Sequence, residues 1–183
     1  MKNIQSITAI AAIFIMSLVA CSSSINKGKN KPEEVQQSQP QEVNKQQEEA
    51  NKLPAFAITD VNGNVINMND FKGKKVFVNL WATWCPPCRA EIPSIEKLYN
   101  KADKEKVVFV MLSLDDNFDK AKEFAKSNNL QLPVYYPAQN LPAMFNTDGI
   151  PATFIFNENG ELIKQNTGME DYDTDSYLQL LKS

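Results

Sequence analysis

The chain contains no histidine, and only two of its three cysteines lie close together in the sequence. A structural zinc site normally has four cysteine or histidine ligands, so this chain cannot supply such a site in the usual way. Basic side chains are not in excess either, since 19 lysine and arginine residues stand against 22 aspartate and glutamate residues. Nucleic-acid-binding proteins normally carry a concentrated basic face, so the composition argues against that class.

The N-terminus also lacks an apolar run long enough to span a bilayer comfortably, which takes about 20 residues. Lys2 is followed by a shorter run, from Ile7 to Val19, and then by Ala20-Cys21. This pattern resembles a bacterial lipoprotein signal, in which small residues precede a cysteine that becomes lipidated. We therefore expect residues 1–20 to be a signal peptide and Cys21 to carry the lipid. A plain secretory signal and an uncleaved anchor are the alternatives.

Residues 21–52 have the composition of a flexible tether. Lysine, glutamate and glutamine dominate, and the few apolar side chains offer too little surface to offset the entropy lost on folding. With a lipidated Cys21, the tether predicts a domain held at the lipid bilayer of the bacterial cell envelope. That domain is extracytoplasmic and faces the periplasm if the cell has two membranes. Lipidation of Cys21 also leaves a single cysteine pair, so the chain has no structural disulfide framework.

The remaining pair lies in the sequence Cys85-Pro86-Pro87-Cys88, between an apolar run that predicts a buried strand and a helical pattern. Two cysteines three residues apart at the start of a helix can form a disulfide without movement of the backbone. The free N–H groups and partial positive charge of a helix N-terminus favour a thiolate on Cys85. The pattern indicates a reversible redox pair, with half a zinc site and an inert disulfide as alternatives.

In the redox interpretation, Cys85 is the nucleophile, because it lies at the exposed helix tip, and Cys88 resolves the mixed disulfide. The pair itself carries the electrons, so we expect no cofactor and no metal. Proline at positions 86 and 87 removes two N–H groups that would stabilise the thiolate. This predicts a reductant, with a potential nearer to about −270 mV than to about −120 mV. In an oxidising compartment the pair then needs an external electron donor.

Composition changes at Leu53, and residues 53–183 have the length of one domain with its own core. Apolar patterns and turn residues predict strands and helices in alternation. In chain order, we expect a hairpin of strands 56–59 and 65–68 around a two-residue turn at Asn62-Gly63, a strand over 75–81, a helix from the cysteines to about Lys101, a strand over 107–114, a helix over 119–127, a loose stretch over 132–145, a hairpin of strands 153–156 and 162–165, and a final helix that ends at Leu181.

A Cys-x-x-Cys motif at the end of a central strand is the thioredoxin arrangement. Three sequences resemble the TlpA/ResA branch of membrane-tethered thioredoxin-like proteins: Trp81-Ala82-Thr83-Trp84-Cys85-Pro86-Pro87-Cys88, Glu91-Ile92-Pro93 and Gly149-Ile150-Pro151-Ala152-Thr153. The resemblance covers about residues 53–183. It implies an α/β thioredoxin-like fold, with a central mixed β-sheet flanked by helices and an N-terminal β-hairpin extension.

The same resemblance implies thiol–disulfide exchange outside the cytoplasm. In this branch the role is often the reduction of protein disulfides, for example those of apocytochrome c before haem attachment. An integral membrane protein would return the electrons to the pair. We expect the domain to act as a monomer.

Glu91 lies three residues after Cys88 and therefore on the same face of the predicted helix. A carboxylate there can take up or release the Cys88 proton, although a solvent-facing acid is the ordinary alternative. Thioredoxins carry a buried aspartate at the position of Asn79, which cannot titrate, and the TlpA/ResA branch typically has a glutamate that matches Glu91. The resemblance therefore favours a role for Glu91 in proton handling or substrate contact.

The resemblance also implies that Ile150-Pro151 is a cis-proline loop that faces the cysteines. A cis bond before Pro151 would leave the Ile150 backbone free to pair with an extended substrate peptide. We expect Trp84 to be an exposed apolar contact next to Cys85, and Trp81 to be part of the core.

Two other kinds of function stay open. Peroxide-reducing peroxiredoxins share the fold, but they use a lone peroxidatic cysteine, whereas this chain has a close pair. The other alternative is a non-catalytic lipoprotein, either a scaffold or a metal chaperone. Copper-delivering relatives of thioredoxin generally use a distal histidine, which this chain lacks.

Overall fold

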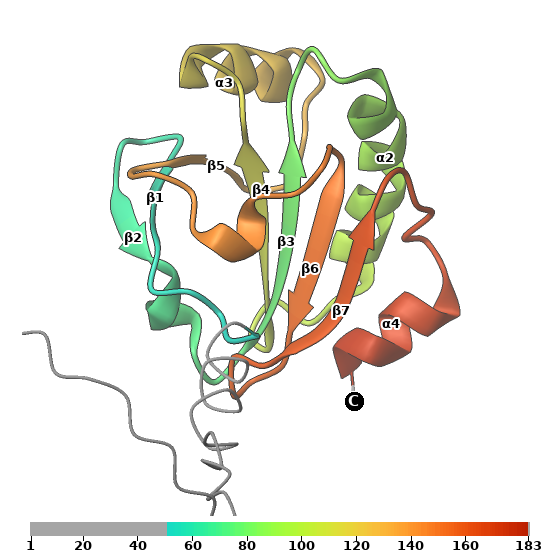
Figure 1. The fold of residues 1–183 in the computed structure, drawn as a ribbon. Coiled ribbons are helices and arrows are strands. Elements are labelled where there is room, and N and C mark those ends of the chain that lie inside the picture. The colour runs from blue at the N-terminus through green and yellow to red at the C-terminus, as the bar shows by residue number, and fades with distance from the viewer. Residues whose placement is uncertain (1–50, 183) are drawn as a thin grey trace, which may run out of the picture. The chain divides into compact units, whose positions relative to one another are not determined.

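The apolar run Lys75–Trp81 forms strand β3, in which every residue is buried, inside a seven-stranded sheet. The computed structural model describes residues 51–182, so the predicted signal peptide, Cys21 and nearly all of the predicted tether lie outside the described residues. The strand order is β2-β1-β5-β4-β3-β6-β7 (Figure 1). The other strands are β1 (Ala57–Asp60), β2 (Val65–Asn67), β4 (Val107–Ser113), β5 (Val134–Pro137), β6 (Ala152–Phe156) and β7 (Leu162–Thr167).

The sheet is mixed. Strands β3, β4 and β5 run parallel to one another, whereas the other neighbouring strands pair antiparallel. The predicted central mixed sheet of an α/β fold is therefore confirmed. The N-terminal hairpin of β1 and β2 extends this same sheet, because β1 pairs with β5 from Ile58 to Asp60.

The turn between β1 and β2 contains three residues rather than the two predicted from Asn62-Gly63. The Asp60 N–H donates to the Asn64 carbonyl, and the Gly63 N–H donates to the Asp60 carbonyl. Gly63 has a φ of +87°, which glycine adopts without strain. The Asp60 carboxylate also accepts the N–H groups of Asn62 and Asn64, so this side chain stabilises the longer turn.

The stretch predicted to be loose, 132–145, contains strand β5, so that prediction is wrong for these residues. Strand β5 lies between β1 and β4 and pairs with β4 at Met111 and Leu112. It follows Pro133 and ends at Pro137. The prolines hide the strand in the sequence, because proline cannot donate to a sheet and is normally a sign against a strand.

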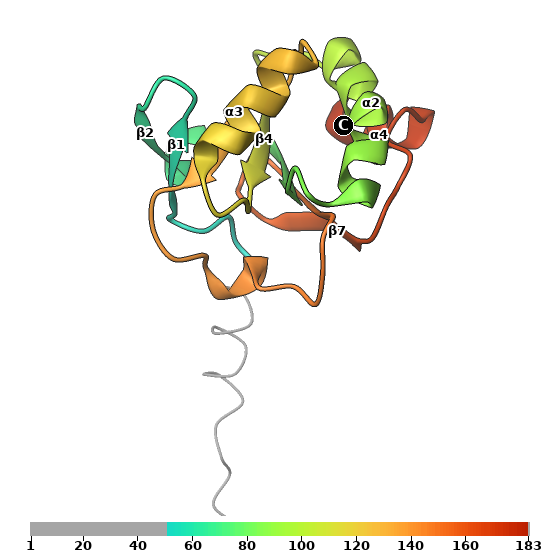
Figure 2. The same ribbon diagram turned by 90° about the horizontal axis from the view of Figure 1, so that it is seen from above.

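Three helices pack on one face of the sheet: α2 (Pro86–Lys101), α3 (Phe118–Ser127) and α4 (Asp175–Lys182). Their apolar side chains share a core with Phe77 and Trp81 of β3, and Figure 2 shows the three helices on the same side. The opposite face is covered by the segment around Phe56 and by two 3₁₀ helices, η1 (Met68–Phe71) and η2 (Ala143–Phe145). Among residues 51–182, the helices lack the length and apolar character that crossing a bilayer requires.

Residues 51–53 attach to the turn between β6 and β7. The Leu53 N–H donates to the Gly160 carbonyl, and the Leu162 N–H donates to the Asn51 carbonyl. Lys52 forms an isolated β-bridge and a salt bridge with Glu161. Ordered contacts therefore begin before Leu53, the residue at which the composition changes.

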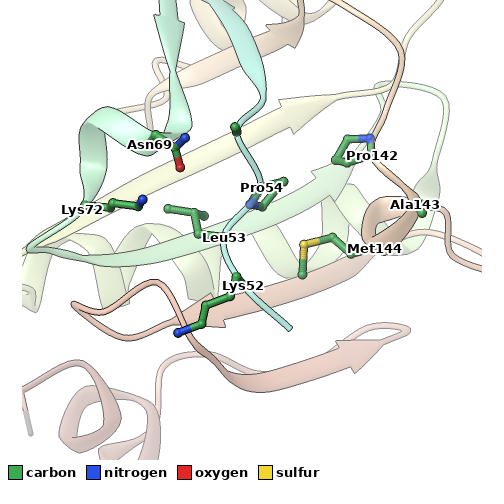
Figure 3. A pocket seen from close by; sticks show the side chains of 9 residues that line it. Lys52, Leu53, Pro54, Asn69, Lys72, Pro142, Ala143 and Met144 are labelled. Carbon is green, nitrogen blue, oxygen red and sulfur yellow. The ribbon is translucent and has the colours of Figure 1, made fainter. Parts of the chain in front are cut away.

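A pocket of about 790 Å³ lies next to this attachment, on the face covered by the 3₁₀ helices. Leu53, Pro54 and Met144 supply much of its apolar lining, and Lys52 and Lys72 are at its border (Figure 3). Neither cysteine of the pair lines this pocket.

Candidate active site

Cys85 is the N-cap of α2, and Pro86 and Pro87 occupy the first helical positions. Proline is tolerated there because the N–H groups at a helix start have no partner within the helix. Cys85 and Cys88 form a disulfide, with a Cα–Cα distance of 5.3 Å, as their spacing allows. The Cys88 N–H lies 3.2 Å from Cys85 Sγ and donates to it. One donor of the helix start therefore reaches this sulfur in spite of the two prolines.

The cysteines are covered in this oxidised form. Cys88 is fully buried and Cys85 is 3% exposed, so the prediction of an exposed Cys85 at the helix tip is wrong for this state. The disulfide bond and the adjoining loop at Ile150 cover the sulfur. Exposure is found instead at the preceding residue: Trp84 is 63% exposed, as expected, whereas Trp81 is buried in the core.

The loop before β6 lies against the cysteines, as the resemblance implies. The peptide bond between Ile150 and Pro151 is cis. The Ile150 carbonyl oxygen lies 3.7 Å from Cys85 Sγ. Pro151 is buried, and its carbonyl accepts the Gly168 N–H at 2.8 Å, which ties this loop to the end of β7.

Glu91 is 2% exposed, so the alternative of a solvent-facing acid is wrong. Its Oε1 accepts a hydrogen bond from Asn79 Nδ2 at 2.7 Å, and its Oε2 accepts the Glu170 N–H at 3.2 Å. Burial raises the pKa of Glu91 from 4.5 to about 7, although both hydrogen bonds oppose this increase. A carboxyl group that changes its charge near neutral pH therefore lies one helical turn after Cys88.

A buried polar network continues from Glu91 to the neighbouring strands. Asn79 Nδ2 also donates to Thr153 Oγ1 at 3.0 Å, and the Tyr172 hydroxyl donates to the same oxygen at 2.7 Å. Tyr172 is fully buried, and burial raises its pKa well above the usual value for tyrosine. Tyr172 therefore remains a donor, and Glu91 is the member of this network that titrates near neutral pH.

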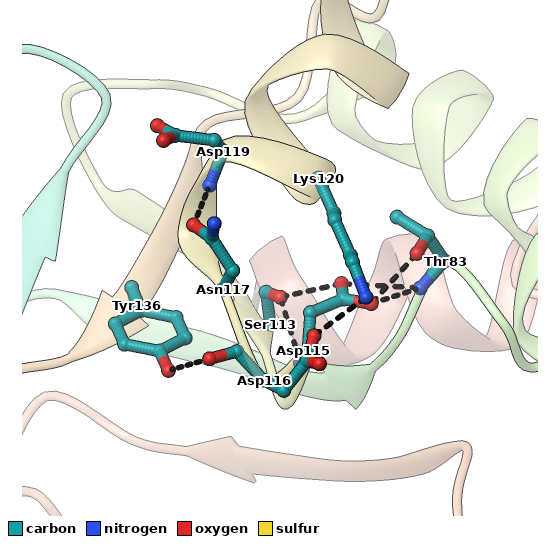
Figure 4. Close-up of polar contacts among 8 residues, drawn as sticks. All are labelled: Thr83, Ser113, Asp115, Asp116, Asn117, Asp119, Lys120 and Tyr136. Atoms are coloured by element: carbon teal, nitrogen blue, oxygen red, sulfur yellow. Dashed lines mark hydrogen bonds and ion pairs between the residues drawn. The ribbon is translucent and has the colours of Figure 1, made fainter.

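Two residues near the site, Asp115 and Tyr172, are not among those predicted from the sequence. Asp115 accepts hydrogen bonds from the Thr83 backbone and hydroxyl, beside the cysteine loop (Figure 4). Tyr172 lies within an acidic run, 170–175, that reads as charges at a helix start. A signal for Asp115 does exist, because it follows β4 at the carboxyl end of the parallel strands, where α/β proteins place functional residues.

The chemistry available at this site is that of the two sulfurs. A dithiol that closes to a disulfide releases two electrons and two protons. Glu91 is the buried carboxyl group on the same helix whose pKa of about 7 lets it change charge near neutral pH. Within residues 51–182, no group of three or more cysteine, aspartate or glutamate side chains is arranged to hold a metal ion.

Comparisons with known proteins agree with this geometry. A family model described as Redoxin matches residues 48–181. Thiol-disulfide oxidoreductase ResA of Bacillus subtilis (strain 168) is 33% identical over 137 residues, which cover 73% of this chain and 76% of that protein. Among solved structures, StoA from Bacillus subtilis has a TM-score of 0.57 and 28% identity, over 70% of this chain and 98% of that chain. A thiol:disulfide interchange protein of the thioredoxin family from Chlorobium tepidum has a TM-score of 0.63 and 27% identity, over 72% of this chain and 96% of that chain.

Proposed function

The chain belongs to the Redoxin family and is a thiol–disulfide oxidoreductase of the TlpA/ResA type, and from this premise we propose that it reduces disulfide bonds of proteins outside the cytoplasm. In this proposal Cys85 is the nucleophile and Cys88 the resolving cysteine. One observation carries the assignment: Cys85 is the N-cap at the start of α2 and adjoins the exposed Trp84 and the Ile150 carbonyl, whereas Cys88 lies inside the helix and is fully buried.

In the reduced protein, the Cys85 thiolate attacks one sulfur of a substrate disulfide. A disulfide between Cys85 and the substrate forms, and the other substrate sulfur leaves as a thiolate and takes up a proton. Cys88 then loses its proton and attacks Cys85 Sγ, which releases the second substrate sulfur and forms the disulfide seen here. Two electrons pass to the substrate, so an external donor must reduce the pair again.

Three further residues support these steps in our proposal. Trp84 offers an exposed apolar surface beside Cys85 to the substrate polypeptide. Ile150, whose carbonyl oxygen lies 3.7 Å from Cys85 Sγ, offers its backbone to an extended peptide. Glu91 exchanges a proton with the Cys88 side of the pair, because it is buried on the same helix and titrates near neutral pH.

The N-terminal sequence supports the location in this proposal. Residues 1–20 act as a signal peptide, the lipidated Cys21 anchors the chain to the bilayer, and a tether leads to the catalytic domain, whose contacts begin at residues 51–53. An integral membrane protein supplies the electrons, and the protein acts as a monomer in the cell envelope. Apocytochrome c is a suitable substrate, because haem attachment to its Cys-x-x-Cys-His sequence requires reduced cysteines.

A Cys88→Ala variant tests the function and the roles of the cysteines. Without the resolving thiol, the bond between Cys85 and its substrate cannot be released, so we expect covalent complexes with substrate proteins. Non-reducing gels detect these complexes, and dithiothreitol separates them by reducing the disulfide. Mass spectrometry shows whether apocytochrome c is one of the trapped proteins. The matched variant, Cys85→Ala, is expected to trap none. Complexes that form with Cys85→Ala and not with Cys88→Ala would reverse the two roles.

The role of Trp84 is tested by a Trp84→Ala variant. Because Trp84 is 63% exposed, we expect a change in the free energy of unfolding of no more than about 0.5 kcal/mol. Loss of an aromatic contact is expected to raise the KM for a protein disulfide about 10-fold and leave kcat nearly unchanged. Val65, which is 67% exposed on the edge strand β2, gives the control Val65→Ala. An equal rise in KM for both variants would contradict a specific contact at Trp84.

A further inference from the structure

Asp115 is a buried carboxylate two residues after the end of β4, with 3% of its surface exposed. Its Oδ1 accepts the Thr83 hydroxyl at 2.6 Å, and both carboxylate oxygens lie 3.2 Å from the Thr83 backbone nitrogen. Its Oδ2 also accepts the Ser113 hydroxyl at 2.8 Å. Thr83 lies in the loop between β3 and α2 and Ser113 at the end of β4, and Figure 4 shows both side chains hydrogen-bonded to Asp115.

The nearby lysine does not account for the burial of Asp115. Lys120 Nζ forms its ion pair with the exposed Asp116, at 2.8 Å, and attracts Asp115 only from a greater distance. A buried carboxylate is stable only when hydrogen bonds replace its lost hydration. Donors on Thr83 and Ser113 supply these bonds, so the carboxylate and the Thr83 loop stabilise each other.

Thr83 lies in the middle of a short loop between β3 and α2 that is anchored on both sides. The Leu114 N–H donates to the Trp81 carbonyl at 2.8 Å, and the Cys85 N–H donates to the Ala82 carbonyl at 3.1 Å. Asp115 fixes both the backbone and the side chain of Thr83 between these two bonds. One residue separates Thr83 from Cys85, so this fixation limits the freedom of Cys85 to move away from Cys88.

We propose that Asp115 is a positioning residue for disulfide exchange, which through Thr83 holds Cys85 where Cys88 can close the intramolecular disulfide. The inference rests on the proposed function and deepens it. A loop that is ordered before the reaction raises the effective concentration of one thiol at the other. Loss of the Asp115–Thr83 contact therefore weakens the disulfide relative to the dithiol and slows the resolving step.

The test uses the full chain and two variants that break this contact from opposite sides. Thr83→Val removes the hydroxyl at nearly constant shape, and Asp115→Asn replaces one acceptor oxygen by a donor. For each, we expect the equilibrium constant for oxidation of the dithiol by glutathione disulfide to fall about 5- to 10-fold. Thr83→Ser keeps the hydroxyl and should retain the wild-type constant. Tyr136→Phe removes a hydrogen bond to the Asp116 carbonyl in the same cluster and should also leave the constant unchanged.

The outcomes separate positioning from mere stabilisation of the fold. A lower melting temperature of Thr83→Val with an unchanged equilibrium constant would overturn the proposal, as would an equal fall in Thr83→Ser. If Asp115→Asn does not fold, the equilibrium constants of Thr83→Val and Thr83→Ser still show whether the contact between Thr83 and Asp115 affects the disulfide. The glutathione equilibrium needs no protein substrate. A wild-type protein that fails to reduce protein disulfides would therefore refute the proposed function. The glutathione equilibrium would still test the positioning role of Asp115.

Discussion

Replacing Cys85 with serine is expected to lower the rate of protein disulfide reduction by at least about 10³-fold. A serine hydroxyl is not ionised at neutral pH, so the variant has no thiolate to attack the substrate. It also cannot form the intramolecular disulfide that Cys85 and Cys88 form in the structure. Reduction of insulin with dithiothreitol as the electron donor measures the loss, which should appear at every pH.

The control for this variant is the wild-type protein with its disulfide reduced. Both proteins lack the bond between positions 85 and 88, so equal melting temperatures would show that the loss of rate is chemical and not a loss of fold. A rate near that of the wild type in Cys85→Ser, together with a loss in Cys88→Ser, would mean that the nucleophile has been assigned to the wrong cysteine.

A Glu91→Gln variant is expected to lose a pH dependence of stability that the wild type shows between about pH 4.5 and 7. In the folded protein burial raises the pKa of Glu91 from 4.5 to about 7, so in this window the folded state keeps a proton that the unfolded chain has released. The contribution of Glu91 to stability is therefore most favourable below pH 4.5 and decreases as the pH rises. Above pH 7 the decrease reaches about 3 kcal/mol.

Urea denaturation of the oxidised proteins across this pH range measures the effect. Relative to Glu91→Gln, the wild type should lose about 3 kcal/mol of unfolding free energy between pH 4.5 and 8. The control is Glu123→Gln on the exposed surface of α3, which should follow the wild type. Parallel stability curves for the wild type and Glu91→Gln would show that folding does not raise the pKa of Glu91.

The same Glu91 variant also tests the proposed proton transfer. Above pH 7 the ionised Glu91 can accept the Cys88 proton, so the wild-type rate of disulfide exchange should rise through an inflection near pH 7 that the variant lacks. At about pH 8 we expect the variant to be about 10-fold slower. This is less than general-base catalysis usually gives, because solvent also removes thiol protons at that pH. Identical pH profiles would remove Glu91 from the proposed mechanism.

Much of the fold follows directly from the sequence. The runs that form β3 and β4 are nearly continuous in apolar residues, because both faces of these central strands are covered. The start of α2 is marked by two prolines at its first positions. The cysteine pair follows from its spacing at a helix start, the loop at Pro151 follows from the resemblance, and the structure brings the two together.

The features that the sequence does not show depend on contacts between distant segments. Strand β5 is recognisable only when β1 and β4 lie on either side of it. Glu91 has the sequence context of a surface helix residue, and it is buried because Asn79 of β3 and Glu170 beyond β7 supply its hydrogen bonds. Asp115 is separated by 32 positions from Thr83, the residue that makes its burial possible. Local sequence patterns carry no information on such pairs.

The attachment of residues 51–53 lies far from the cysteine pair. These residues bind the turn after β6, and the Gly73 N–H, just before β3, donates to Glu158 of the same turn. Cys85 follows the other end of β3, a strand of seven residues that spans roughly 20 Å. Residues 51–53 and the cysteine pair therefore lie at opposite ends of β3. A substrate can reach Cys85 at one end of this strand without contacting residues 51–53 at the other end.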